Sequence, residues 1–366
     1  MATQHTSAAD RVLMSRIIWR LLPLLVACLV VQSIDKGNIG FAKLGMLSDL
    51  GFSEAVLGFG SSLFYVGYLL FEVPSSIANY HYGARLWFAR IMLTWAITTL
   101  LLAATQSAVM FYILRFALGA AEAGLYPSLI FFLTLWFPES ERARVMGYLT
   151  LGSALGNGLS AMISGSLLDI DGAMSLAGWQ WIFLVTGILP LVTMVLVLRY
   201  LPSRPEEATF LAPDERRRVD ELVAASAGPS RHGGMGTLLA NPLVIGFGLI
   251  YAILLGSLYG INYWMPTVLH EFDVSGRLNG VIIAIPWVLD VLLLVTVMPR
   301  LRSARSVIGG LFVLSLIAIL SFAAAASGGG LAFKGVAIML GIPAISLCIA
   351  CFWTIPVRYF TGAQAA

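Results

Sequence analysis

Hydrophobic residues in this chain are grouped into long runs that are separated by short polar segments. A run of about 20 apolar residues is long enough for a helix that crosses a hydrocarbon core of about 30 Å. Such runs predict ten spans, at 18–43, 56–79, 86–104, 108–136, 145–168, 179–200, 242–268, 278–298, 306–326 and 330–357. The pattern predicts an all-α polytopic membrane protein, because in lipid a helix satisfies its own backbone polar groups. A β-barrel is disfavoured, since its strands would alternate and be only about ten residues long.

Composition supports a membrane protein and excludes several soluble classes. Of the 366 residues, 59% are hydrophobic and 11% are charged, whereas about a quarter are charged in a typical soluble domain. The three cysteines lie in apolar runs and are expected to be small buried residues rather than a disulfide framework. The chain has no phosphate loop, HExxH, GxSxG or dinucleotide-binding glycine motif. We therefore expect no enzyme, and no cofactor, metal or nucleic-acid partner.

One long polar segment divides the spans into six and four. This segment, 201–241, contains three prolines and a charged stretch that predicts a short amphipathic helix around 214–224. The expected organisation is an N-terminal six-helix half at 1–200, a cytoplasmic loop at 201–241 and a second half of about four helices at 242–366. The first apolar run is too long for a cleaved signal peptide, so it is expected to be a retained helix.

The distribution of Lys and Arg predicts the orientation. With the N-terminus in the cytoplasm, 17 of the 22 cations fall in inner segments, and only Lys43, Arg277 and Lys334 fall in outer segments. Lys36 and Arg115 lie within spans. Because positive residues accumulate on the cytoplasmic side, this distribution predicts a multi-pass plasma or inner-membrane protein with its N-terminus inside.

An internal repeat relates the two halves. The segment 47–53, followed by Gly58, recurs as 269–275 followed by Gly280, at a constant offset of 222. The apolar, acidic, apolar, Ser and Gly positions coincide in the two copies. Each copy follows the first span of its half, which indicates two structurally related bundles.

Charged residues within the predicted spans are the candidates for function, because such residues are costly in lipid and face a cavity or a partner. Asp35 and Lys36 lie in the outer third of the first span, and Arg115 reaches a similar depth in the fourth. Glu122 follows Arg115 by seven residues and so shares its helix face. Lys36 and Arg115 are predicted to bind an anion, with Asp35 or Glu122 as the proton carrier. The alternatives are that Lys36 extends toward the interface and that Arg115 and Glu122 belong to a structural network.

Other polar positions give weaker signals. Tyr68, in the middle of the second span, is placed to donate to a substrate oxygen, although packing explains it equally well. Glu72, near the inner end of that span, is predicted to form a cytoplasmic gate with Arg85, Arg90 or Arg142. Asp290 in the eighth span is a buried acid without an obvious role.

Several segments together resemble the anion:cation symporter family of the major facilitator superfamily. The most specific are Ile34-Asp35-Lys36-Gly37-Asn38 in the first span and Arg115-Phe116-Ala117-Leu118-Gly119-Ala120-Ala121-Glu122 in the fourth. Further similar segments are Gly67-Tyr68-Leu69-Leu70-Phe71-Glu72-Val73-Pro74, Trp136-Phe137-Pro138, Gly178-Trp179-Gln180-Trp181 and Phe352-Trp353-Thr354-Ile355-Pro356. The resemblance implies a monomeric secondary transporter for proton-coupled symport of a small organic anion such as a sugar acid, tartrate or phthalate. It implies substrate contacts at Lys36, Arg115 and Tyr68, and proton coupling at Asp35 and Glu122.

The sequence also departs from that family. Lys36 stands where Arg is usual, and the second half is expected to lack the last two helices of the superfamily plan, since the chain stops near the start of an eleventh span. A non-transporting membrane protein, such as a truncated remnant, a sensor or a partner subunit, is therefore an open alternative. A transporter of neutral or cationic solutes is a second one, which the paired cations disfavour.

Overall fold

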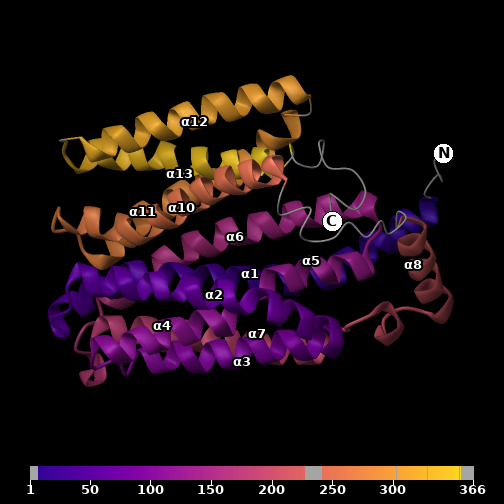
Figure 1. Cartoon of the computed structure of the whole chain (residues 1–366), viewed down its shortest axis with the longest axis horizontal. Coiled ribbons are helices and arrows are strands. Elements are labelled where there is room, and N and C mark those ends of the chain that lie inside the picture. The colour runs from indigo at the N-terminus through magenta and orange to yellow at the C-terminus, as the bar shows by residue number, and fades with distance from the viewer. Residues whose placement is uncertain (1–6, 227–240, 302, 328, 354, 356–366) are drawn as a thin grey trace. The chain divides into compact units, whose positions relative to one another are not determined.

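Helices make up most of the part of the chain that the computed structural model describes, which is residues 7–226, 241–301, 303–327, 329–353 and 355 (Figure 1). The α-helices are α1 Ala8–Asp49, α2 Glu54–Tyr82, α3 Ala84–Leu102, α4 Ala108–Glu122, α5 Leu125–Trp136, α6 Glu139–Leu168, α7 Gly178–Tyr200, α8 Pro213–Ser226, α10 Pro242–His270, α11 Gly276–Thr296, α12 Ala304–Ala326 and α13 Leu331–Trp353. Short 3-10 turns occur at Ala173–Ser175, Pro205–Glu207 and Met298–Arg300. The predicted all-α polytopic fold class is confirmed.

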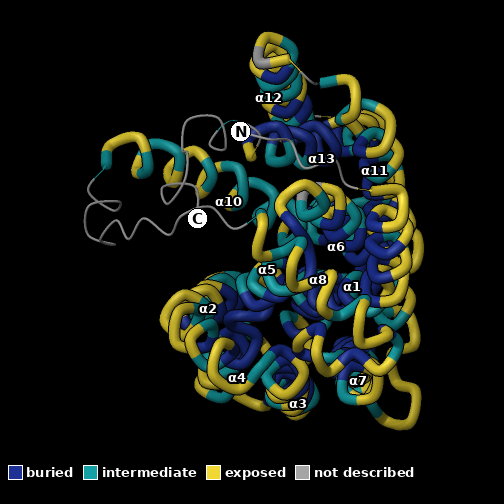
Figure 2. The backbone as a smooth tube through the Cα atoms, turned by 90° about the vertical axis from the view of Figure 1, so that its right-hand side faces the viewer, coloured by how far each residue is buried: buried dark blue, intermediate teal, exposed yellow. Residues whose placement is uncertain are grey.

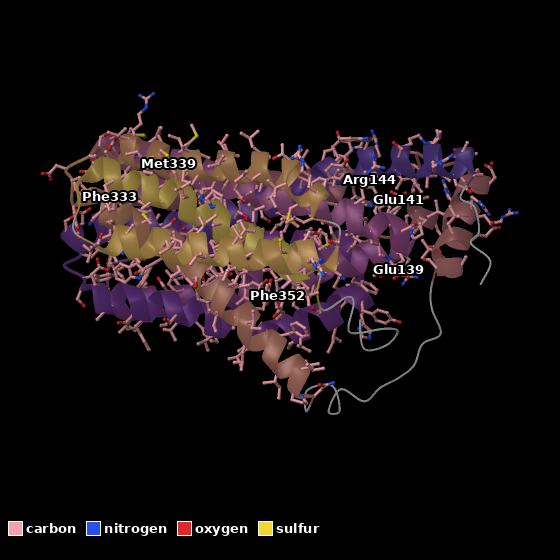
Figure 3. The ribbon with its side chains drawn as sticks, turned by 90° about the horizontal axis from the view of Figure 1, so that it is seen from above. Glu139, Glu141, Arg144, Phe333, Met339 and Phe352 are labelled. Carbon is pink, nitrogen blue, oxygen red and sulfur yellow. The ribbon has the colours of Figure 1, made fainter. Side chains whose placement is uncertain are left out.

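Each predicted span lies largely on helix in the described residues, and positions 354, 356 and 357 of the tenth lie outside them. Nine spans in the described residues are long and apolar enough to cross a membrane. The fifth predicted span corresponds to α6, which has sufficient length but is outside that set of nine. Its first two turns carry Glu139, Glu141 and Arg144 (Figure 3), of which the last two form an ion pair at 3.8 Å. The acids stand at the N-terminus of α6, where the helix dipole favours negative charge.

The internal repeat has a structural explanation at its serines. Ser53 caps α2 by accepting a hydrogen bond from the Val56 amide, and Ser275 caps α11 by accepting one from the Leu278 amide. An N-cap serine satisfies an amide that has no partner within its own helix. The two serines are related by the repeat offset, so the repeat marks the start of the second helix in each half.

The fourth predicted span is interrupted. α4 ends at Glu122, and α5 begins at Leu125 after Gly124, whose φ of +84° lies in the left-handed region that favours glycine. A side chain on Gly124 would also collide with Ser75 of α2. Pro127 follows within the first turn of α5, and a proline cannot donate the amide hydrogen bond that a continuous helix needs. The interruption therefore lies immediately after Glu122.

The chain forms two compact units, which are described separately. The first contains the described residues of 7–35, Met46–Gly156 and 180–226, and the second contains 36–45, Asn157–Trp179 and the described residues from 241 onward. Both α1 and α6 therefore contribute to each unit. Many positions along the helices are exposed (Figure 2). They include large apolar residues such as Leu69 of α2 and Ile253 of α10. Exposed apolar surface of this extent is expected of helices that contact lipid.

Within the first unit, the amphipathic helix α8 packs against the start of α1. Arg218 donates two hydrogen bonds to Asp10, at 2.8 and 3.0 Å, and Arg16 forms an ion pair with Glu215. Trp136 at the end of α5 stacks on Phe210, which precedes α8. At 42 residues α1 is about 63 Å long, twice the thickness of the hydrocarbon core, so its first turns are available for these contacts.

Candidate functional site

The candidate site is organised by the close packing of α2 and α4 in the first unit. Gly119 of α4 and Gly67 of α2 lie at this contact, and each faces the backbone of the other helix. A Cβ atom on Gly119 would lie 1.9 Å from the Phe64 carbonyl oxygen, and one on Gly67 would lie 2.3 Å from that of Phe116. Only glycine is compatible with backbones this close. The contact fixes the relative position of the side chains on both helices.

Arg115 of α4 is held at this helix pair. Its side chain is buried, and its guanidinium carbon lies 4.8 Å from the centre of the Phe64 ring. A guanidinium over an aromatic face is stabilised by the ring quadrupole, more so when both are desolvated. Tyr68, one turn along α2, is half-buried, and its ring centre lies 6.1 Å from that of Phe64. Phe64 therefore links the two predicted substrate-binding residues of this unit.

Asp35 of α1 brings the acids to the same place. Its carboxyl group is buried and accepts a hydrogen bond from the Thr99 hydroxyl of α3 at 3.0 Å. The Glu122 and Trp95 side chains lie beside it, and Arg115 is near enough to act on it electrostatically. Glu122 is also completely buried. Four helices of the first unit thus assemble two carboxyls and one guanidinium away from solvent.

Lys36 belongs to the other compact unit. It follows Asp35 on α1 and is half-buried, but residues 36–45 pack with the second unit. Its predicted pairing with Arg115 as a second cation for one substrate therefore stays a prediction.

The predicted cytoplasmic gate also stays a prediction. Glu72 on α2 is half-buried, and the exposed Arg85 donates its backbone amide to the Ser203 hydroxyl at 3.1 Å. Arg142 donates from its guanidinium to the carbonyl oxygens of Phe137, at 2.8 Å, and Thr134, at 3.4 Å. In this conformation Arg142 satisfies carbonyls at the C-terminal end of α5.

Asp290 of α11 lies in the second unit and is completely buried. One of its carboxyl oxygens accepts a hydrogen bond from the Ser346 hydroxyl of α13 at 2.7 Å. The sequence indicated its burial but not this partner.

Sequence reasoning missed several residues around the charged groups. Thr99, Trp95 and Phe64 contact Asp35 or Arg115, yet all three read as ordinary members of apolar runs. Thr99 had a detectable signal, because it belongs to a pair of threonines inside the third span. Phe64 had no such signal, because a phenylalanine that contacts a buried cation cannot be told from a core phenylalanine in the sequence.

A sequence profile described as the Major Facilitator Superfamily matches residues 25–366. The chain belongs to the major facilitator superfamily. The resemblance to the anion:cation symporters is confirmed by curated relatives. A protein named "Putative tartrate transporter" from Agrobacterium vitis is 35% identical over 99% of this chain and 81% of its own length.

Other superfamily members are similar over comparable lengths. The "Quinolone resistance transporter" of Acinetobacter baumannii is 33% identical over 96% of this chain and 82% of its own length. The solved structure of the xylose transporter XylE from E. coli has the same fold, with a TM-score of 0.72 at 14% identity, covering 95% of this chain and 87% of that one. These relatives are transporters rather than enzymes, in agreement with the sequence interpretation.

Proposed function

We propose that this superfamily member is a secondary active transporter that carries a small organic carboxylate together with protons across the inner membrane. The observation that carries the proposal is the buried group of Arg115, Asp35 and Glu122 in the first unit. An intramembrane cation with two acids beside it is costly to maintain, and such groups occur along ion and substrate pathways.

The charges of this group explain how proton and anion binding are coupled. With both acids ionised, two negative charges compete with a substrate for the single guanidinium of Arg115. Protonation of Asp35 or Glu122 removes that competition, so Arg115 is available to bind a carboxylate through two parallel hydrogen bonds. Because coupling between two ligands is reciprocal, the bound anion in turn strengthens proton binding. Proton and anion are therefore taken up together.

Two further residues are assigned to substrate binding. Tyr68 lies on the same face of α2 as Phe64, whose ring lies against the Arg115 guanidinium. The Tyr68 hydroxyl would donate a hydrogen bond to a polar group of the substrate. Lys36 would supply a second positive charge for an anion, as a point charge rather than a bidentate fork. The gate of Glu72, Arg85 and Arg142 would close the cytoplasmic side.

The distribution of charge supports the proposed orientation, and the relatives support the proposed substrate class. The excess of cations in alternate segments supports a cytoplasmic N-terminus. Carboxylates are the first substrates to test, because a relative similar over nearly the whole chain is named for tartrate. The positive charges of Lys36 and Arg115 also favour an anion over a neutral sugar such as xylose, for which XylE is named.

The test is uptake into proteoliposomes that contain the full chain, with an imposed pH gradient and a panel of labelled carboxylates that begins with tartrate. Arg115→Gln should reduce uptake about 100-fold, since a charge-assisted bidentate contact contributes up to about 3 kcal/mol. Arg115→Lys should give an intermediate rate, because it keeps the charge and loses the fork. Arg277→Gln, at an exposed position at the start of α11, is the matched control and should transport normally.

The outcomes separate the anion site from proton coupling. Wild-type uptake by Arg115→Gln, with normal membrane insertion, would refute the anion site. Asp35→Asn and Glu122→Gln should lose uptake driven by the pH gradient and retain exchange of internal for external substrate. Competition by amines rather than carboxylates would show that the substrate is a cation.

A further inference from the structure

Lys43, near the end of α1 in the second unit, is completely buried although the sequence places it in an outer segment. Its ammonium nitrogen lies 4.2 Å from the centre of the Tyr263 ring and 3.9 Å from that of Trp264, both on α10. The two rings stand edge to face, with an interplanar angle of 86°. A cation this close to two aromatic rings is held by their electron-rich faces, and the attraction is strongest where water is excluded.

The helices that meet at Lys43 are the first of each sequence half. One turn before Lys43, Gly40 faces α10 so closely that a Cβ atom there would lie 2.6 Å from the Asn262 carbonyl oxygen. Residues 40 and 262 are separated by 222, which is also the offset of the internal repeat. Repeat-equivalent positions meet where a pseudo-twofold axis passes between two related elements. The contact of α1 with α10 therefore lies on the axis that relates the two halves.

We propose that Lys43, Tyr263 and Trp264 form a latch that holds closed the end of the substrate pathway toward which α1 runs. Alternating access moves one half of a transporter against the other about a central site, so first helices that touch at the axis must part when this end opens. Opening withdraws the ammonium from both rings and returns it to water. The hydration that the ammonium regains offsets much of the lost attraction, which keeps the latch reversible.

The latch assigns a role to three residues that neither the substrate group nor the cytoplasmic gate uses. Its location on the outer side rests on the proposed orientation, in which the N-terminus is cytoplasmic. Lys43 acts on transport by setting the population of the closed state and does not bind the substrate.

The test measures access to a position beneath the latch. Asn38 lies on α1 five residues before Lys43, about 7.5 Å along the helix, and is 1% exposed. The reporter is Asn38→Cys in a full-length chain whose three buried cysteines, Cys28, Cys348 and Cys351, are replaced by alanine. The probe is a membrane-impermeant maleimide, applied to right-side-out and to inverted vesicles.

Lys43→Met, which keeps the length of the side chain and removes its charge, should raise the labelling rate about thirtyfold in right-side-out vesicles. The matched control is Lys334→Met, because Lys334 also lies over a ring, at 5.3 Å from the centre of Phe272, but is only half-buried. It should label at the wild-type rate. Trp264→Leu should act like Lys43→Met, and Trp264→Phe, which keeps an aromatic face, should restore slow labelling.

An unchanged labelling rate in Lys43→Met, or an equal rise in Lys334→Met, overturns the latch. If Lys43→Met does not give a monodisperse protein, the Trp264 pair decides, and equal rates for leucine and phenylalanine overturn the proposal. A rise confined to inverted vesicles supports the latch and refutes the orientation given under the proposed function. The readout needs no substrate, so failure of the carboxylate proposal leaves this test intact.

Discussion

Replacing Gly119 by alanine is expected to damage the site without changing any residue that would touch the substrate. The added Cβ atom would lie 1.9 Å from the Phe64 carbonyl oxygen, 2.8 Å from its carbonyl carbon and 2.9 Å from the Tyr68 nitrogen. Ordinary contact begins at 3.4 Å, so α2 and α4 must separate by about 1.5 Å. Both neighbours are backbone, and neither can move aside by changing a rotamer.

The displacement reaches the site because Phe64 lies under Arg115, with 4.8 Å between ring centre and guanidinium carbon. Overpacking of this kind typically costs about 1–3 kcal/mol of stability. A misplacement of about 1 Å among groups that must act together can reduce a rate about 100-fold. We therefore expect a measurable fall in thermal stability and a much larger proportional fall in uptake.

The assay pairs thermal unfolding in detergent with carboxylate uptake in proteoliposomes. Gly58→Ala is the matched control, because Gly58 lies on the same helix α2 and a Cβ atom there meets no atom within 4 Å. It should leave uptake unchanged, with stability equal to or slightly above that of the wild type, since alanine is the better helix former. Wild-type stability and uptake in Gly119→Ala, or equal losses in the two variants, would refute the reasoning.

Two further predictions concern contacts outside the site. Asp169 accepts hydrogen bonds from the Gly276 and Arg277 amides at the start of α11, at 2.6 and 2.8 Å, so Asp169→Ala should destabilise the protein by about 1 kcal/mol in thermal unfolding, and Asp169→Asn by less. The Arg16 guanidinium holds the pKa of Glu215 below its ordinary value. This contact therefore stabilises the packing of α8 at any pH above the ordinary pKa of Glu215, and the stabilisation is lost as the pH falls through the lowered pKa. Hydrogen exchange of α8 amides should therefore be faster in Glu215→Gln at neutral pH and equal to the wild type in strong acid; a difference that persists in acid would contradict this origin.

The helices were predictable because lipid imposes a simple rule on the chain. Apolar runs of sufficient length gave each span, and α8 was found at Pro213–Ser226 where charge patterning had placed it at 214–224. The extent of α1 was underestimated, since its first turns are polar. They are helical because Ser7 and Asp10 form a capping box and because α8 packs on them.

The interruption of the fourth span was missed for a different reason. Hydropathy does not report backbone angles, and Arg115 and Glu122 are the only charged residues in the otherwise mostly apolar segment 108–136. Gly124 and Pro127 were the available signals, but either residue alone is common in membrane helices.

The candidate site was predictable in its charged members and not in its neutral ones. A charge in an apolar run is conspicuous, so Asp35, Arg115 and Glu122 were identified. Contacts such as Thr99 with Asp35 depend on the rotation of one helix against another, which a single sequence does not encode locally. Lys43 was assigned to an outer segment for its charge alone, and its burial against two rings was not predicted.

The sharing of α1 between the two compact units has a mechanical consequence. The helix passes from the first unit to the second between Asp35 and Lys36 and returns to the first at Met46. Because α1 is one continuous hydrogen-bonded helix, a displacement at Asp35 is carried along its backbone to the segment that packs with the second unit. Asp35 and Lys43 thus stand about two helical turns apart on one rod, although they belong to different units.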